Sequence, residues 1–252
     1  MNRDTLYTLL KRDEEEEFSG WDFSYLTKIG RTREAPLGWN YASKIMWKLR
    51  EIDSLLDMGT GGGEFLSLLA PLPRKTFATE GYLPNVSVAR NRLEPLGVTV
   101  MEIDGDDDLP FAAESFEMVI NRHESFSAKE VYRILKPGGQ FVTQQVGGEN
   151  DTALNRLLHA PIPTDYAHWN LAYAVHELEQ AGFTILEQKE EFPATRYYDT
   201  GAIVYYLKAI PWQVPDFTVE RYLDALLTIQ QKIDRDGYID IPSHRFLIIA
   251  QK

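Results

Sequence analysis

Short apolar stretches recur along the chain from Ser54 onward, and stretches with helical periodicity separate them. Strand and helix patterns that alternate in this way predict an α/β fold, with a mostly parallel sheet and helices on both faces. The expected strands are residues 54–58, 75–80, 98–104, 116–121, 140–146, 183–191 and 245–250. Between them we expect helices at residues 64–70, 85–93, 128–135 and 168–181, each bounded by a proline or a glycine.

Residues 1–50 precede this pattern and are rich in aromatic side chains. The simplest interpretation is a helical cap that packs on the sheet, with the acidic run of residues 13–17 as a solvated helix end or a mobile arm. The alternative is a lid over a bound ligand, in which Trp21 and Trp39 line a substrate pocket. We therefore expect a cap of residues 1–50 and a main domain of residues 51–252.

A further segment, residues 193–243, separates the last two predicted strands as an insert with two helical patterns. The first pattern ends near Ile210, and the second begins at Thr218, which is a suitable N-cap. Packing is the simpler role for the tyrosines at the start of this insert, and contact with a substrate is the alternative. The residues to which the alternative applies are Tyr197, Tyr198 and Asp199.

The most informative segment lies at the end of the first predicted strand, where Leu-Leu-Asp-Met-Gly-Thr-Gly-Gly-Gly-Glu begins at Leu55. Glycines in such a turn let the backbone approach a ligand closely and allow positive φ. A dinucleotide fingerprint would require a third glycine where Glu64 stands, so a nicotinamide cofactor is disfavoured. The acid that precedes the turn, Asp57, suits a cofactor with an ammonium group better than a pyrophosphate.

Three more segments follow in order. Glu80 ends the second strand about twenty residues after the glycine turn, a spacing at which a carboxylate reaches ribose hydroxyls. The third strand leads into Asp104 and Gly105, followed by Leu-Pro-Phe, and a helix leads through Lys-Pro-Gly-Gly into the fifth strand. Together with the glycine turn, these segments resemble the class I S-adenosylmethionine-dependent methyltransferases.

This resemblance implies S-adenosylmethionine as cofactor and an antiparallel seventh strand. It also implies that the acid after the third strand meets the adenine, although one extra residue leaves Asp104 and Asp106 as alternatives. The residues that the resemblance assigns to cofactor binding are Asp57, Gly59, Thr60, Gly61, Gly63, Glu80, Asp104, Gly105 and Asn121.

The loop after the fourth strand lies beside the transferred methyl group in the resembled fold. His123 is the best candidate for a general base there, because an imidazole titrates near neutrality. A role in shaping the pocket is the equal alternative for His123, and Glu124 is a weaker candidate for the base. Asn121 is expected to meet the methionine end of the cofactor through its backbone.

Composition narrows the possible partners. The chain has 252 residues and a net charge of −12, which argues against a nucleic-acid partner because phosphate binding depends on basic side chains. Without a long apolar run or an apolar leader, neither a membrane span nor secretion is expected, and the cytoplasm is the default location. Cysteine is absent and the histidines form no metal-ligand motif, so no metal site is expected. The oligomeric state stays open.

We therefore expect a methyltransferase that acts on a small molecule by O- or N-methylation. One alternative is an rRNA or tRNA methyltransferase, which the acidic balance disfavours. A second alternative is a non-catalytic protein that binds S-adenosylmethionine.

Overall fold

The computed structural model describes residues 2–18 and 23–252, and the chain divides into two compact units. One unit, the sheet unit, contains Gly38–Gly147, Trp169–Glu191 and Arg245–Lys252. The other, the helical unit, contains Met1–Leu37, Gly148–His168 and Phe192–His244. The segment expected to form a cap is therefore divided after Leu37, and its second part belongs to the sheet unit.

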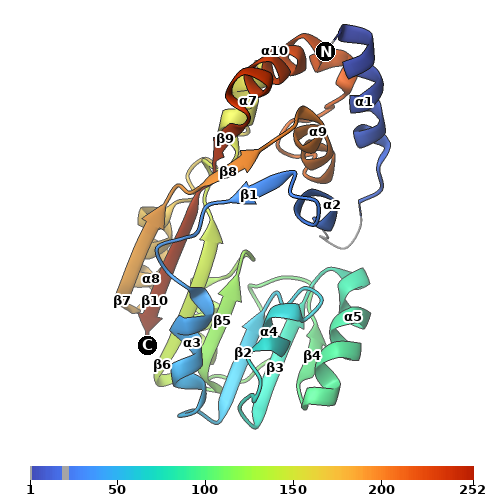
Figure 1. Ribbon diagram of the computed structural model, residues 1–252. Helices are drawn as coiled ribbons and strands as arrows, with labels where there is room; N and C mark the ends of the chain where they lie inside the picture. Colours follow the sequence, from blue (N-terminus) through green and yellow to red (C-terminus); the bar gives the residue numbers. More distant parts are fainter. Residues whose placement is uncertain (1, 19–22) are drawn as a thin grey trace. The chain divides into compact units, whose positions relative to one another are not determined.

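The sheet unit is built on seven strands in the order β4-β3-β2-β5-β6-β10-β7 (Figure 1). Strands β2 to β6 are parallel to one another, and β10 is antiparallel to both β6 and β7. The strands are β2 Ser54–Met58, β3 Lys75–Glu80, β4 Thr99–Glu102, β5 Phe116–Arg122, β6 Leu135–Val146, β7 Thr184–Glu191 and β10 Arg245–Gln251. The predicted fold class, including the antiparallel last strand, is confirmed.

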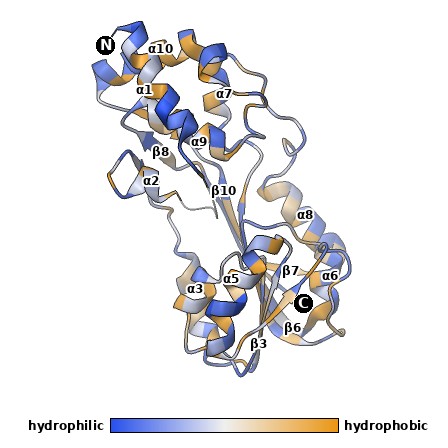
Figure 2. Ribbon diagram, turned by 90° about the vertical axis from the view of Figure 1, so that its right-hand side faces the viewer, coloured by the Kyte–Doolittle hydropathy of each residue, from blue (hydrophilic) through white to orange (hydrophobic). Residues whose placement is uncertain are grey.

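Helices cover both faces of this sheet, with α3 and α5 on one side and α6 and α8 on the other (Figure 2). The helices of the unit are α3 Tyr41–Leu49, α4 Glu64–Leu68, α5 Leu83–Leu93, α6 Ala128–Ile134 and α8 Leu171–Ala181, and a 3-10 turn spans Glu94–Leu96. All five residues of β2 are buried, as expected for a central strand with helices on both faces. Each of the four predicted helices is present, with shifted ends.

The order of the strands reverses between β2 and β5: the chain moves outward to β3 and β4, and then returns to the other side of β2. Loops that leave the carboxyl ends of β2 and β5 therefore diverge, and in open α/β sheets such a crevice is where ligands bind. The glycine turn follows β2 and His123 follows β5, so the topology brings both to this edge.

The helical unit combines the first 37 residues, residues 148–168 and the predicted insert. Its elements are α1 Arg3–Glu15, α2 Ser24–Thr27, β1 Thr32–Glu34, α7 Thr152–Leu158, β8 Ala194–Tyr197, α9 Thr200–Ala209, α10 Val219–Asp236 and β9 Ile239–Pro242. The helices expected before Ile210 and after Thr218 are present as α9 and α10, and Thr218 accepts a hydrogen bond from the Arg221 amide as the N-cap.

A three-stranded antiparallel sheet, β1-β8-β9, was not predicted for this unit. Its strands have only three or four residues, too few for an alternating pattern to stand out in the sequence. Helix α9 is buried on nearly every side, and its apolar residues form the centre of the unit's core. Among the described helices of the whole chain, none is long and apolar enough to cross a bilayer.

An ion-pair network ties the separate segments of the helical unit together. Arg31 donates hydrogen bonds to Asp13 on α1 and to both carboxylate oxygens of Asp199, and Asp199 also caps α9. Asp13 is buried and accepts a second hydrogen bond, 2.7 Å long, from the hydroxyl of Tyr25. The expectation that residues 13–17 form a solvated helix end is therefore wrong for Asp13, which has a cationic partner far away in the sequence.

Replacing Arg31 with methionine should destabilise the helical unit by about 3 kcal/mol, because the buried Asp13 carboxylate would lose its cation and the partly exposed Asp199 would lose the same partner. Urea denaturation followed by circular dichroism measures this change. The matched control is Arg33→Met on β1, where the side chain is exposed and the expected change is within about 0.5 kcal/mol. Equal denaturation midpoints for the two variants would contradict the role given to the network.

Candidate functional site

The glycine turn after β2 is a cradle of left-handed backbone. Gly59, Gly61 and Gly63 have φ of 66°, 61° and 79°, values that favour glycine. A Cβ on Gly59 would clash with the Glu124 side chain, whereas a Cβ on Gly61 would meet no atom within 4 Å. Space therefore lies directly over Gly61, where a ligand can approach the backbone.

A pocket opens over this turn, and all of its lining residues belong to the sheet unit. On one side lie the turn and the start of α4, and on the other lie two residues that follow the buried part of β5. The lining residues are Asp57, Gly59, Thr60, Gly61, Glu64, Phe65, Leu68, Arg122 and His123. The structure thus brings four of the predicted cofactor residues and the predicted base to one pocket, with Gly63 directly behind them as the first turn of α4 begins.

Asp57 is the buried acid of this pocket, with 4% of its surface exposed. Burial disfavours the charged form and raises the pKa of Asp57 to about 7, against the opposing effect of the positive charge on Arg122. A carboxylate of this kind is costly when unpaired, so a ligand with an ammonium group would stabilise its charged form. Thr60 anchors the turn beside it, because its amide donates a 2.9 Å hydrogen bond to the carbonyl of Thr79 on β3.

Glu80 stands at the carboxyl end of β3 and is 5% exposed. One of its carboxylate oxygens, Oε1, accepts a 2.7 Å hydrogen bond from the Tyr82 amide, which fixes the side chain. Its other oxygen has no hydrogen-bond partner within the described part of the chain. The side chain therefore offers a free acceptor at the place where a ribose is expected.

Asp104 and Gly105 lie in an acidic loop after β4, beside a second hollow of the sheet unit. This hollow is lined by Glu102, Ile103, Asp104, Gly105, Asp106, Asp107, Asp108 and Pro110. Asp106 accepts a hydrogen bond from the Ser125 hydroxyl, and desolvation raises its pKa. Asp106 is thus attached to the loop after β5, which leaves Asp104 as the better candidate for contact with the adenine.

Asn121 lies beneath the loop after β5 and is completely buried. Its side-chain oxygen accepts hydrogen bonds from Thr143 (2.9 Å) and Gln145 (2.6 Å), and its side-chain nitrogen donates to the Ser125 carbonyl. Both backbone groups of Asn121 bond to the hydroxyl of Tyr41, at 3.1 Å for the amide and 2.9 Å for the carbonyl. In this structure Asn121 therefore holds the loop in place, with its hydrogen-bonding groups already used.

His123 projects from that loop at a φ of 60°, with its backbone amide bonded to the Gln144 carbonyl at 2.8 Å. The ring lies at the surface of the pocket, but neighbouring atoms displace much of its water. This desolvation, with the positive charges of Arg245 and Arg122, lowers the pKa of His123 to about 3. A group with so low a pKa is a weak base, so the predicted base role gains no support from the geometry.

Glu124, the weaker candidate for the base, lies across Gly59. Desolvation and the nearby charges of Asp106 and Glu80 raise the pKa of its carboxyl group. A carboxylate with a raised pKa takes up a proton more readily than an ordinary one.

The residues expected to bind substrate lie in different places. Trp39 is buried and donates a hydrogen bond to Gln144, so it supports the loop after β5 and does not line the pocket. Tyr197 is enclosed in the core of the helical unit, Tyr198 is partly exposed, and Asp199 pairs with Arg31. Trp21 lies outside the described residues.

Sequence reasoning missed Tyr41, Gln144 and Arg122. Tyr41 and Gln144 are recognisable only by the side chains that they meet in space. Arg122 was signalled by its position one residue before His123, and its guanidinium lies 5.2 Å from the Phe65 ring at the pocket wall.

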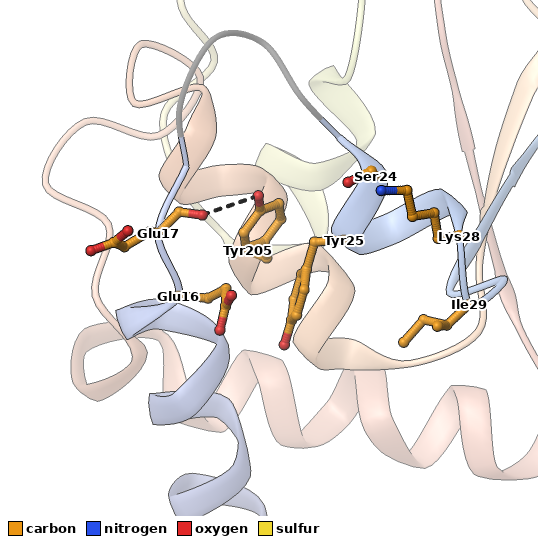
Figure 3. A pocket seen from close by; sticks show the side chains of 7 residues that line it. All are labelled: Glu16, Glu17, Ser24, Tyr25, Lys28, Ile29 and Tyr205. Atoms are coloured by element: carbon orange, nitrogen blue, oxygen red, sulfur yellow. Dashed lines mark hydrogen bonds between the residues drawn. The ribbon is translucent and has the colours of Figure 1, made fainter.

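The helical unit has a hollow of its own, lined by Glu16, Glu17, Ser24, Tyr25, Lys28, Ile29 and Tyr205 (Figure 3). Its tyrosine hydroxyls are already used, since Tyr25 donates to Asp13 and Tyr205 donates to the Glu17 carbonyl at 3.4 Å. The lining mixes two carboxylates with one ammonium group, and none of these residues was a predicted site residue. The glycine-turn pocket is therefore the stronger candidate site.

Comparison with known proteins gives a match over the segment that contains this pocket. Residues 56–143, which run from β2 into β6 and include the glycine turn, Glu80 and His123, match the family described as a methyltransferase domain. These residues are thus a methyltransferase domain of this family, whose members use S-adenosylmethionine as methyl donor.

A curated relative is the biotin biosynthesis bifunctional protein BioHC of Teredinibacter turnerae, which is 29% identical over 181 residues. The match covers 62% of this chain but only 31% of that protein, so the chain spans about a third of the length of its relative.

Solved structures share the fold of the methyltransferase. A proposed methyltransferase (BH2331) of Bacillus halodurans C-125 is 23% identical with a TM-score of 0.56, over 83% of this chain and 99% of that one. The YcgJ protein of Bacillus subtilis is 17% identical with a TM-score of 0.57, over 84% of this chain and 97% of that one.

Replacing Gly61 with alanine should weaken S-adenosylhomocysteine binding to the methyltransferase at least tenfold, because the new methyl group would occupy the space left for the ligand. Gly97→Ala is the matched control, since Gly97 also has a positive φ and open space around it but lies before β4, away from the pocket. Both variants should lose about 1 kcal/mol of stability from the left-handed backbone.

Thermal unfolding with and without ligand separates the two effects, because a ligand at a hundred times its dissociation constant stabilises by about 2.7 kcal/mol. The control should keep the full ligand-induced shift. A full shift in Gly61→Ala would mean that no ligand lies against this glycine.

Cofactor affinity should also depend on pH through Asp57. If its carboxylate pairs with the ligand's ammonium group, the charged form must be present, and that form is lost as the pH falls through about 7. The affinity for S-adenosylhomocysteine should therefore drop about tenfold between pH 8 and pH 6. Calorimetry at several pH values measures it, and Asp57→Asn should bind weakly with a flat profile. A flat profile in the parent protein would exclude this pairing.

Proposed function

We propose that this methyltransferase transfers the methyl group of S-adenosylmethionine to a small-molecule acceptor and releases S-adenosylhomocysteine. The observation that carries the proposal is the joint placement of the open Gly61 turn, the buried Asp57 and the loop of His123 around one pocket. The net charge of −12 supports a small acceptor over RNA, since RNA phosphates bind to basic side chains and this chain has an excess of acidic ones. The name of the curated relative, a biotin biosynthesis protein, supports a small-molecule acceptor.

The residues present fit this cofactor. The turn at Gly59, Gly61 and Gly63, with the Thr60 amide bonded behind it, would hold the methionine part beside Asp57. Glu80 would bond the ribose through its unpaired oxygen, and the loop at Asp104 and Gly105 would flank the adenine. When bound, the sulfonium supplies an activated methyl group.

The chain's own contribution is then mainly geometric. Methyl transfer is an in-line displacement, so holding the acceptor close to the methyl carbon and excluding water account for much of the acceleration. The rigid support beneath the loop after β5, from Asn121, Tyr41 and Gln145, suits this task because the loop cannot shift without breaking buried hydrogen bonds.

Glu80→Gln tests the cofactor assignment. Losing a carboxylate that accepts hydrogen bonds from the ribose removes about 1.5–3 kcal/mol per bond, so S-adenosylhomocysteine should bind tenfold more weakly or worse. Glu94→Gln, an exposed carboxylate in the turn before β4, is the matched control and should bind as the parent does. Calorimetry measures both. An unchanged affinity in folded Glu80→Gln would exclude the ribose contact.

A labelled-methyl screen tests the acceptor class. The protein is incubated with radiolabelled S-adenosylmethionine and either a metabolite extract or total RNA. Label should enter the small-molecule pool and not RNA. Label in RNA that fades steeply with added salt would overturn the small-molecule proposal in favour of a nucleic-acid acceptor, and label in neither pool would favour a non-catalytic binding protein.

A further inference from the structure

Three side chains form a chain of hydrogen bonds that ends on the ring of His123. The indole Nε1 of Trp39 donates to Oε1 of Gln144 at 2.9 Å, and Nε2 of Gln144 lies 3.0 Å from Nε2 of His123. Trp39 and Gln144 are both buried, and all three residues belong to the sheet unit. Trp39 therefore holds in place the Gln144 amide that contacts His123.

The direction of these bonds follows from the donors alone. An indole N–H can only donate, so the oxygen of the Gln144 amide must face Trp39, and turning the amide over would set two donors against each other. The amide nitrogen of Gln144 then faces His123, and because it too can only donate, Nε2 of His123 must accept. A neutral imidazole in this position carries its single proton on Nδ1.

The surrounding charges keep the ring neutral. Arg122 at the end of β5 and Arg245 at the start of β10 both disfavour a second proton on His123, and desolvation acts in the same direction. Within the described part of the chain, Nδ1 of His123 has no hydrogen-bond acceptor. His123 lines the pocket with Arg122, and its Nδ1–H donor is not used within the described part of the chain.

We propose that His123 is a neutral hydrogen-bond donor that orients an anionic oxygen of the methyl acceptor molecule, with Trp39 and Gln144 as positioning residues that set its tautomer. This inference rests on the proposed function and specifies its substrate class: a small molecule with a carboxylate, phenolate or enolate oxygen. Arg122 favours such an anion and disfavours a protonated amine in the same place.

The electron and proton balance of methyl transfer to an anionic oxygen agrees with a hydrogen-bond donor at His123. An oxygen that is already deprotonated attacks the methyl carbon with its own electron pair, and the carbon–sulfur bond breaks with its pair left on sulfur. The sulfonium becomes a neutral thioether and the acceptor anion becomes a neutral methyl derivative. No proton has to be removed, so the loop needs a donor at His123 and no base.

Nitrogen-15 spectra of the imidazole test the tautomer without any turnover. In the complex with S-adenosylhomocysteine, the His123 signals, assigned by their loss in His123→Asn, should show a protonated Nδ1 and an unprotonated Nε2 from pH 5 to pH 8. Gln144→Glu should move the proton to Nε2 and make the ring titrate near neutrality, because a carboxylate accepts where the amide donated. Trp39→Phe should yield a mixture of tautomers, since the Gln144 amide is then free to turn.

A protonated Nε2 in the parent protein, or titration of its ring near pH 6.5, would overturn the proposal. Calorimetry with S-adenosylhomocysteine on the same samples reports cofactor binding separately, so failure of the tautomer assignment is distinguishable from failure of the proposed function.

Benzoate and benzylamine, two rings of similar size and opposite charge, serve as probes of the acceptor side. Benzoate should shift the His123 Nδ1–H signal in the S-adenosylhomocysteine complex, and benzylamine should not. An effect of benzylamine equal to that of benzoate, or no effect of benzoate, would overturn the anion preference.

Turnover with the acceptor found in the labelled-methyl screen separates a donor from a base. His123→Asn is the conservative variant, because asparagine tolerates the positive φ and places an amide nitrogen where Nδ1 lies, but cannot take up a proton. It should keep kcat/KM within about tenfold of the parent, while His123→Ala should lose about tenfold to a hundredfold. Equal losses in both variants, together with a pH profile that loses its His123-dependent limb, would assign a base and overturn the proposal.

Discussion

The site depends on one topological constraint, the reversal of strand order between β2 and β5. Both strands are buried between layers of helices, so their backbone groups are satisfied within the sheet and only their carboxyl ends are open to a ligand. The chain leaves β2 through the glycine turn and leaves β5 through the loop of His123. The residues that line the pocket all lie on or beside these two segments.

Several buried polar side chains hold the loop after β5 in place. Asn121, Thr143 and Gln145 satisfy one another beneath it, and Tyr41 reaches from α3 to the backbone of β5. A buried polar group without a partner costs stability, so these side chains must keep the one arrangement in which all of them are hydrogen-bonded. The result is a loop of irregular backbone, with His123 in the left-handed region, that is nevertheless fixed. Fixed geometry is what an in-line displacement requires of a protein.

The helical unit shows the same principle in a different form. Its three chain segments are separated by long stretches of sequence, yet Arg31 joins α1 to the start of α9, and β1 pairs with β8 from the insert. A guanidinium with several carboxylate oxygens around it is compatible with burial because its donors are used. The unit is thus one core, assembled from pieces that flank the methyltransferase segments along the chain.

The sequence by itself determined the seven-stranded fold, the glycine turn and the position of Glu80. These features are local: an apolar strand, an acid and glycines at fixed spacing carry their meaning within a few residues. Only the tertiary structure decided the roles of Trp39, Gln144 and Asp13. The Trp39 indole was a candidate for a pocket wall and instead donates to the Gln144 amide, and Asp13 was expected in solvent and instead pairs with Arg31.

The short β1-β8-β9 sheet was also decided only by the tertiary structure, because its strands form only where distant segments meet. The physical reason is the same in each case. A hydrogen bond or ion pair between residues far apart in the chain depends on where packing brings their side chains, and no pattern of neighbouring residues contains that information.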